Sequence, residues 1–75
     1  MSTPRIVDAR GLEPPQPLHL ILEALDTLPH GDEAVLLLYR EPVPLYGILK
    51  QNGFTHRTEF GEDGTVSIHI RHAGD

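Results

Sequence analysis

The clearest hydrophobic pattern in the chain is an apolar stripe at helical spacing in its first half. Leucine or isoleucine stands at positions 18, 21, 22, 25 and 28, while His19, Glu23 and Asp26 fall on the opposite side. This spacing predicts an amphipathic helix over about residues 15–28. The prolines just before and inside its first turn are compatible with a helix start, because the N–H groups there have no intrahelical partner.

The remaining apolar residues follow strand patterns, with one shorter helix among them. Residues 5–9 read as a short strand, and the continuous apolar run 34–39 reads as a central strand covered on both faces. Pro42 opens a second helix that ends at Asn52 and Gly53. Residues 54–60 and 65–71 are predicted to form a hairpin. For its apolar faces to lie on one side, the connection needs an odd number of residues or a bulge.

These elements predict the order β-α-β-α-β-β. The expected fold class is an α/β (α+β) two-layer sandwich, in which two helices cover one face of a four-stranded mixed sheet. We expect one domain over residues 1–75, with an ordered core over about 5–71.

The composition of the chain narrows the range of partners and cellular locations that we expect for the protein. Eleven acidic residues against six Lys and Arg give a net charge of −5, so no basic face for nucleic acid is expected. The stretch 18–28 is too short and too polar to span a bilayer, and residues 1–10 contain no apolar leader. We therefore expect a cytoplasmic protein that binds neither nucleic acid nor membrane. A protein partner or self-association is the favoured interaction, and a small ligand is the alternative.

One motif resembles a known family. Residues Asp8-Ala9-Arg10-Gly11-Leu12 run into Pro14-Pro15-Gln16-Pro17-Leu18, which looks like the motif of the TusA/SirA-like sulfur-carrier proteins. The cysteine of that family aligns with Pro14. The segment 40–45 is closer to a subgroup that lacks the cysteine and is filed as a domain of unknown function. The resemblance implies a sheet in which the last strand lies between the second and third, antiparallel to both.

The chain contains no cysteine, which bears directly on activity. Persulfide transfer needs a thiolate nucleophile, so we expect no sulfur-carrier activity. No other catalytic arrangement or cofactor site is recognisable in the sequence, and we expect a non-enzymatic protein without a cofactor.

The first candidate site is the sheet edge where the predicted helices begin. Helix starts attract anions, although prolines there have no N–H to donate and two glutamates oppose an anion. The alternative to an anion site is that these are ordinary surface charges and that the prolines only set the direction of the chain. The candidate binding residues are Arg10, Glu13, Pro14, Pro15, Pro17, Arg40 and Glu41.

Histidines form the second candidate set, and a protein-binding surface the third. The histidines are His19, His30, His56, His69 and His72. His56 and His69 are expected on opposite sheet faces, so we assign no residue as a metal ligand, but a metal-binding domain that uses the histidines stays part of the alternative function, beside an anion-binding domain that uses Arg10 and Arg40. The uncovered sheet face must expose either Leu36 and Leu38 or the alternate residues Val35, Leu37 and Tyr39. The predicted interaction residues are Leu36, Leu38, Tyr39 and Tyr46.

Overall fold

The computed structural model describes residues 3–74 and confirms the predicted order of elements. They are β1 (Arg5–Asp8), α1 (Gln16–Asp26), β2 (Glu33–Leu38), α2 (Val43–Gln51), β3 (Phe54–Phe60) and β4 (Val66–His72). Helix α1 is shorter than the apolar stripe suggested: Leu28 lies beyond its end but is still buried. Three residues of the predicted domain, Met1, Ser2 and Asp75, lie outside the described residues.

The four strands form one mixed sheet in the order β1-β2-β4-β3. Strands β1 and β2 are parallel, and β4 is antiparallel to both β2 and β3. The last strand therefore occupies the position that the resemblance implied. Phe60 pairs with Val66, so five residues connect β3 to β4, which confirms the expected odd-numbered connection.

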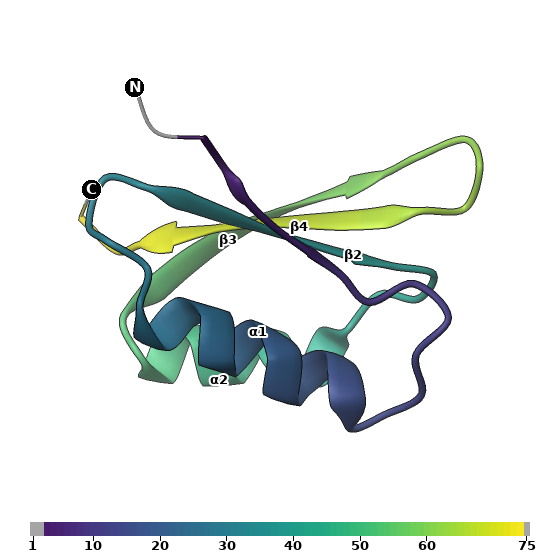
Figure 1. Cartoon of the computed structure of the whole chain (residues 1–75), viewed down its shortest axis with the longest axis horizontal. Coiled ribbons are helices and arrows are strands. Elements are labelled where there is room, and N and C mark those ends of the chain that lie inside the picture. The colour runs from purple at the N-terminus through teal and green to yellow at the C-terminus, as the bar shows by residue number, and fades with distance from the viewer. Residues whose placement is uncertain (1–2, 75) are drawn as a thin grey trace.

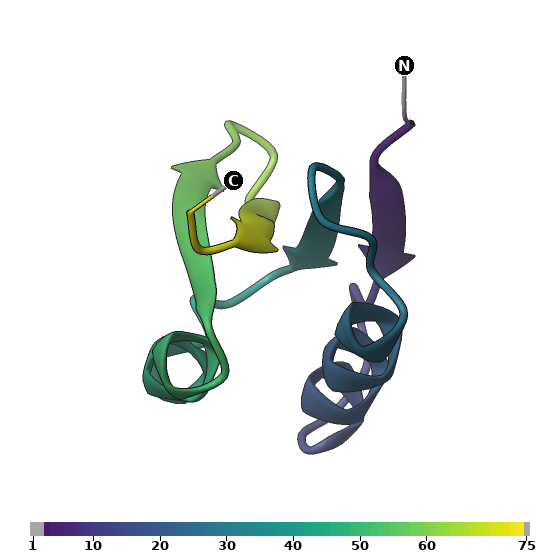
Figure 2. The ribbon, with the colours of Figure 1, turned by 90° about the vertical axis from the view of Figure 1, so that its left-hand side faces the viewer.

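Both helices lie on the same face of the sheet (Figure 1). Helix α1 covers β1 and β2, and α2 covers β3, so the two helices lie under opposite edges of the same sheet face (Figure 2). The core between the layers is apolar, and its most deeply buried large side chains are Ile21, Leu36, Leu49, Ile68 and Ile70.

The alternation along β2 settles which residues face the helices. Ala34, Leu36 and Leu38 are buried in the core, so the prediction that placed Leu36 and Leu38 on the uncovered sheet face is wrong. The uncovered face carries Val35 and Leu37 instead, because their register partners on β4 are the polar residues His69 and Ser67. Val35 is only 6% exposed there. The exposed apolar side chain on the open face is that of Ile6 on β1, the register partner of Val35, which is 57% exposed.

No helix among residues 3–74 is long and apolar enough to cross a membrane.

Candidate functional site

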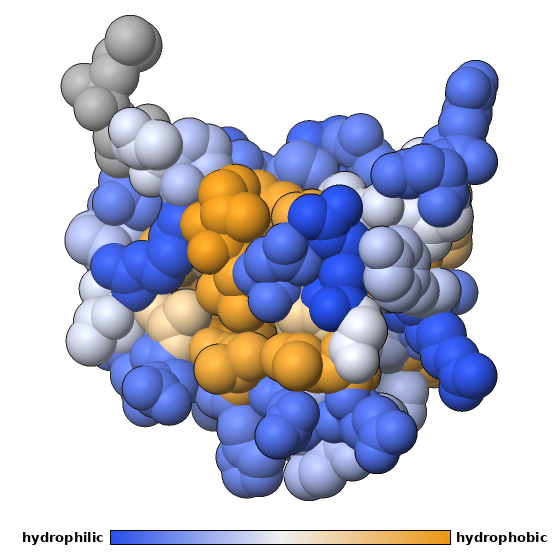
Figure 3. Space-filling model, turned by 45° about the vertical axis from the view of Figure 1, so that its right-hand side comes forward, coloured by the Kyte–Doolittle hydropathy of each residue, from blue (hydrophilic) through white to orange (hydrophobic). Residues whose placement is uncertain are grey.

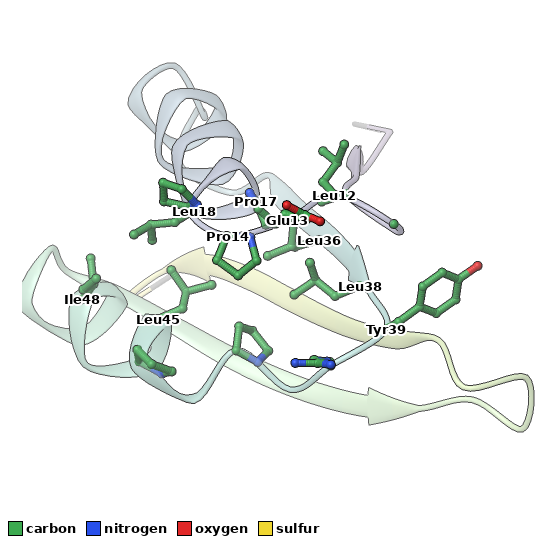
Figure 4. Close-up of a pocket in the computed structure, with 16 residues that line it drawn as sticks. Leu12, Glu13, Pro14, Pro17, Leu18, Leu36, Leu38, Tyr39, Leu45 and Ile48 are labelled. Carbon is green, nitrogen blue, oxygen red and sulfur yellow. The ribbon is translucent and has the colours of Figure 1, made fainter.

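A pocket of about 640 Å³ lies at the end of the sheet where both helices begin. We call it the groove. Its floor contains Leu36 and Leu38, and its walls come from the segments that lead into α1 and α2 (Figure 4). On the molecular surface, apolar residues gather at this end, flanked by hydrophilic ones (Figure 3). The lining residues that the sequence had marked as candidates are Glu13, Pro14, Pro15, Pro17, Leu36, Leu38, Tyr39 and Arg40.

Prolines determine the chemistry of the groove walls. Pro15 and Pro42 are the residues that cap α1 and α2, and neither helix has a side-chain cap. Pro17 and Pro44 stand in the first turns. Since none of these residues has an N–H group, the two helix starts lack several donors that normally bind an anion. Recognition of a charged ligand here depends on side chains.

Arg10 is not among the residues that line the groove, and its side chain is bound to Asp8. Its guanidinium donates from Nε to Oδ1 over 2.9 Å and from Nη2 to Oδ2 over 2.8 Å, and its backbone N–H also donates to Oδ1. These bonds lower the pKa of the Asp8 carboxyl to about 2. Of the two candidate arginines, Arg10 is therefore bound by Asp8, whereas Arg40 lines the groove.

Two charged side chains line the groove: Glu13 before α1 and Arg40 before α2. Both residues are exposed, and neither side chain forms a hydrogen bond or ion pair with any residue in the range 3–74. The groove therefore presents one unpaired anion and one unpaired cation on an apolar background.

Glu41, another candidate residue, is not among the residues that line the groove, and it accepts a hydrogen bond from Tyr46. The Tyr46 hydroxyl lies 3.0 Å from Glu41 Oε2 and 2.6 Å from Thr58 Oγ1. The ring of Tyr46 stacks on His56, with 4.1 Å between ring centroids and 6° between planes. Burial raises the pKa of the Tyr46 hydroxyl. Tyr46, predicted as an interaction residue, instead ties α2 to the edge strand β3.

Sequence reasoning missed this cluster, although part of the signal was present. His56 and Thr58 are two residues apart on β3, so strand alternation places both on the same face, which is the helix face. What the sequence did not reveal is that Tyr46 points toward that strand rather than toward solvent.

The C-terminal histidine has a structural role. His72 Nε2 donates to the backbone oxygen of Leu28 over 2.7 Å. This bond fastens the end of β4 to the segment that connects α1 to β2. The ring of His72 stacks on His30 at 3.8 Å between centroids and also contacts Phe54.

His69 lies on the open face between two glutamates. Its Nδ1 is 3.3 Å from Glu33 and its Nε2 is 3.4 Å from Glu59, while His56 is on the helix face as predicted. His19 is exposed on α1. Within residues 3–74, no group of three or more histidines and carboxylates could hold a metal ion.

Tyr39 lies just past the end of β2, is 58% exposed and points away from the groove at its rim (Figure 4). The predicted interaction residues Leu36 and Leu38 thus lie on the floor of the groove, and Tyr39 lies at its rim.

A comparison of the sequence with models of known protein families finds a match that covers nearly the whole chain. No curated protein and no solved structure matches the chain significantly. The family model described as uncharacterized conserved protein (DUF2249) matches residues 6–72, which include all of the groove. The chain belongs to this DUF2249 family.

Proposed function

We propose that this protein is a non-catalytic binding module that regulates or signals by holding a small, partly apolar ligand in the groove. The observation that carries the proposal is the shape and lining of the groove, a concave pocket of about 640 Å³. Ligand sites are typically concave, mostly apolar and equipped with a few polar groups, and they span roughly 300–1,000 Å³.

Two further observations support this location over the open sheet face. The open face is largely polar on β3 and β4, and Val35 in its middle is almost fully buried. The groove also lies at the carboxyl ends of the parallel strands β1 and β2, where open α/β sheets commonly bind ligands. In the resemblance to sulfur carriers, the aligned cysteine position is Pro14, which also lines the groove.

The test uses a neutral apolar fluorescent probe, N-phenyl-1-naphthylamine, and two matched variants. Leu12 and Leu20 are 41% and 40% exposed, but only Leu12 lines the groove. We expect saturable binding that Leu12→Lys weakens by about tenfold or more, as loss of an apolar contact plus a charge would do, and that Leu20→Lys leaves unchanged. Absence of saturable binding, or an equal loss in both variants, would refute the groove as a binding site.

A protein partner at the same end of the molecule is the second candidate. Tyr39 and Val43 are each 58% exposed beside the groove, and exposed tyrosines often anchor protein contacts. This candidate predicts that Tyr39→Ser abolishes association with a partner or a second copy. Native mass spectrometry of untagged protein, with and without dilution, measures self-association directly. A monomer at all concentrations would leave a different protein as the remaining partner.

A further inference from the structure

The charges at the groove end are divided into paired and unpaired ones. Arg10 is bound to Asp8, and Glu41 accepts a hydrogen bond from Tyr46. Glu13 and Arg40, in contrast, line the groove and bind no residue in the described chain. The groove thus keeps one positive and one negative group available for a ligand.

The two groups come from opposite walls of the groove. Glu13 belongs to the segment that enters α1, and Arg40 belongs to the segment that enters α2. The same pocket is lined by Leu36 and Leu38 on β2 and by Leu45 on α2 (Figure 4). A ligand that lies on this floor therefore has both a guanidinium and a carboxylate among the residues that line its pocket.

Backbone donors do not replace these side chains. Both helix starts are built from prolines, and the Gln16 N–H is already donated to the Glu13 carbonyl. A ligand carboxylate therefore has the Arg40 guanidinium as its main partner, and guanidinium groups bind carboxylates through two parallel hydrogen bonds.

We propose that the groove binds a free α-amino acid with an aliphatic side chain, with its carboxylate at Arg40, its ammonium group at Glu13 and its side chain on the leucine floor. This inference rests on the proposed function and specifies its ligand class. A simple carboxylate would pair with Arg40 but bring a second negative charge near Glu13. A simple amine would have the converse problem at Arg40. A zwitterion satisfies both groups, and its zero net charge avoids repulsion by a protein of net charge −5.

The geometry also favours a free amino acid over a longer peptide. In an amino acid both charges are attached to one carbon atom, so they can engage both walls of a single pocket. In a peptide the two termini are separated by the backbone, and each internal amide would need a partner that proline-rich walls do not supply.

The experiment is a titration followed by amide NMR shifts, with four ligands that share one aliphatic tail. L-Leucine carries both charges, 4-methylpentanoate lacks the ammonium group, 3-methylbutylamine lacks the carboxylate, and 3-methylbutan-1-ol lacks both. We expect leucine to bind at least about tenfold more tightly than each of the other three, because each of them lacks at least one of the two charge-assisted pairs.

Three variants assign the charges. Arg40→Gln should reduce leucine binding by about tenfold and make leucine no better than the amine, and Glu13→Gln should make it no better than the carboxylate. Arg10→Gln is the matched control: it removes an arginine that is bound to Asp8, so leucine binding should not change.

The outcomes separate the two proposals. If 3-methylbutan-1-ol or 4-methylpentanoate binds as tightly as leucine, the zwitterion inference is wrong while the groove remains a binding site. If the neutral fluorescent probe binds but none of the four ligands does, the ligand class is again wrong. If the probe also fails to bind, the proposed function itself is refuted.

Discussion

The hydroxyl of Tyr46 bonds to Glu41, just before α2, and to Thr58 on the edge strand β3. Removing this hydroxyl tests how much the two bonds contribute to the stability of the fold. The variant Tyr46→Phe deletes one oxygen atom. It leaves the ring in place to stack on His56. Any change in stability is therefore attributable to the two hydrogen bonds of the hydroxyl, to Glu41 and to Thr58.

The magnitude follows from the character of the two bonds. A hydrogen bond to a charged group contributes about 1.5–3 kcal/mol and a neutral one about 0.5–1.5 kcal/mol. Glu41 is exposed, so solvent screening reduces its share to the low end. We expect Tyr46→Phe to lower the free energy of unfolding by about 1–2 kcal/mol, out of roughly 4–11 kcal/mol for a chain of this length.

Urea denaturation at pH 7, followed by far-UV circular dichroism, measures this loss. With a denaturant slope of about 1 kcal/mol per M, the midpoint should fall by about 1–2 M. Tyr39→Phe is the control, because Tyr39 is 58% exposed and its hydroxyl bonds to no residue within 3–74. Equal midpoints for the two variants would show that water replaces the partners of Tyr46, and the reasoning would fail.

Three further changes test other parts of the fold by the same denaturation assay. Ile68→Ala in the fully buried centre of β4 should cost about 2–5 kcal/mol, and a loss below about 1 kcal/mol would contradict the core assignment. Asp8→Asn should flatten the acid limb of the stability profile. The Arg10 bond holds the folded pKa of Asp8 at about 2, below the unfolded value near 4, so the stability it contributes is present above about pH 4 and is lost as pH falls toward 2. Gly47→Ala inside α2 should stabilise by about 0.5–1 kcal/mol, whereas Gly53→Ala should destabilise by about 1 kcal/mol because Gly53 has a φ of +82°. The same sign for both glycine variants would refute this contrast.

The fold was predictable where one face of an element is apolar and the other polar. Val66, Ile68 and Ile70 alternate with polar residues, so the buried face of β4 could be read directly from the sequence. The run along β2 is apolar at every position from Ala34 to Leu38, so periodicity contained no information about which side the helices cover. Tertiary packing decides that question: the sequence left two alternatives for the open face, and the alternative with Leu36 and Leu38 was wrong because both are buried in the core.

The candidate site was predictable in its location but not in its pairings. The predicted helix starts placed the candidate residues at one edge of the sheet, which is where the structure has the groove, but the groove itself was not predicted. The roles of Arg10 and Glu41 depend on side-chain orientation. Arg10 binds Asp8, two residues away, and Glu41 binds Tyr46, five residues away. A separation of five residues matches neither helical nor strand spacing, and Arg10 lies beyond the end of β1, so strand alternation does not determine its contact with Asp8.

The position of β4 inside the sheet has a consequence for how the chain folds during synthesis. Strand β3 pairs with β4 alone, and β2 pairs with β4 on one side and β1 on the other. Until β4 has left the ribosome, β3 has no partner strand, and the layer under the helices lacks Val66, Ile68 and Ile70. The nascent chain therefore holds a β-α-β unit with an unpaired edge, and the sheet closes only when its last strand inserts between two earlier ones.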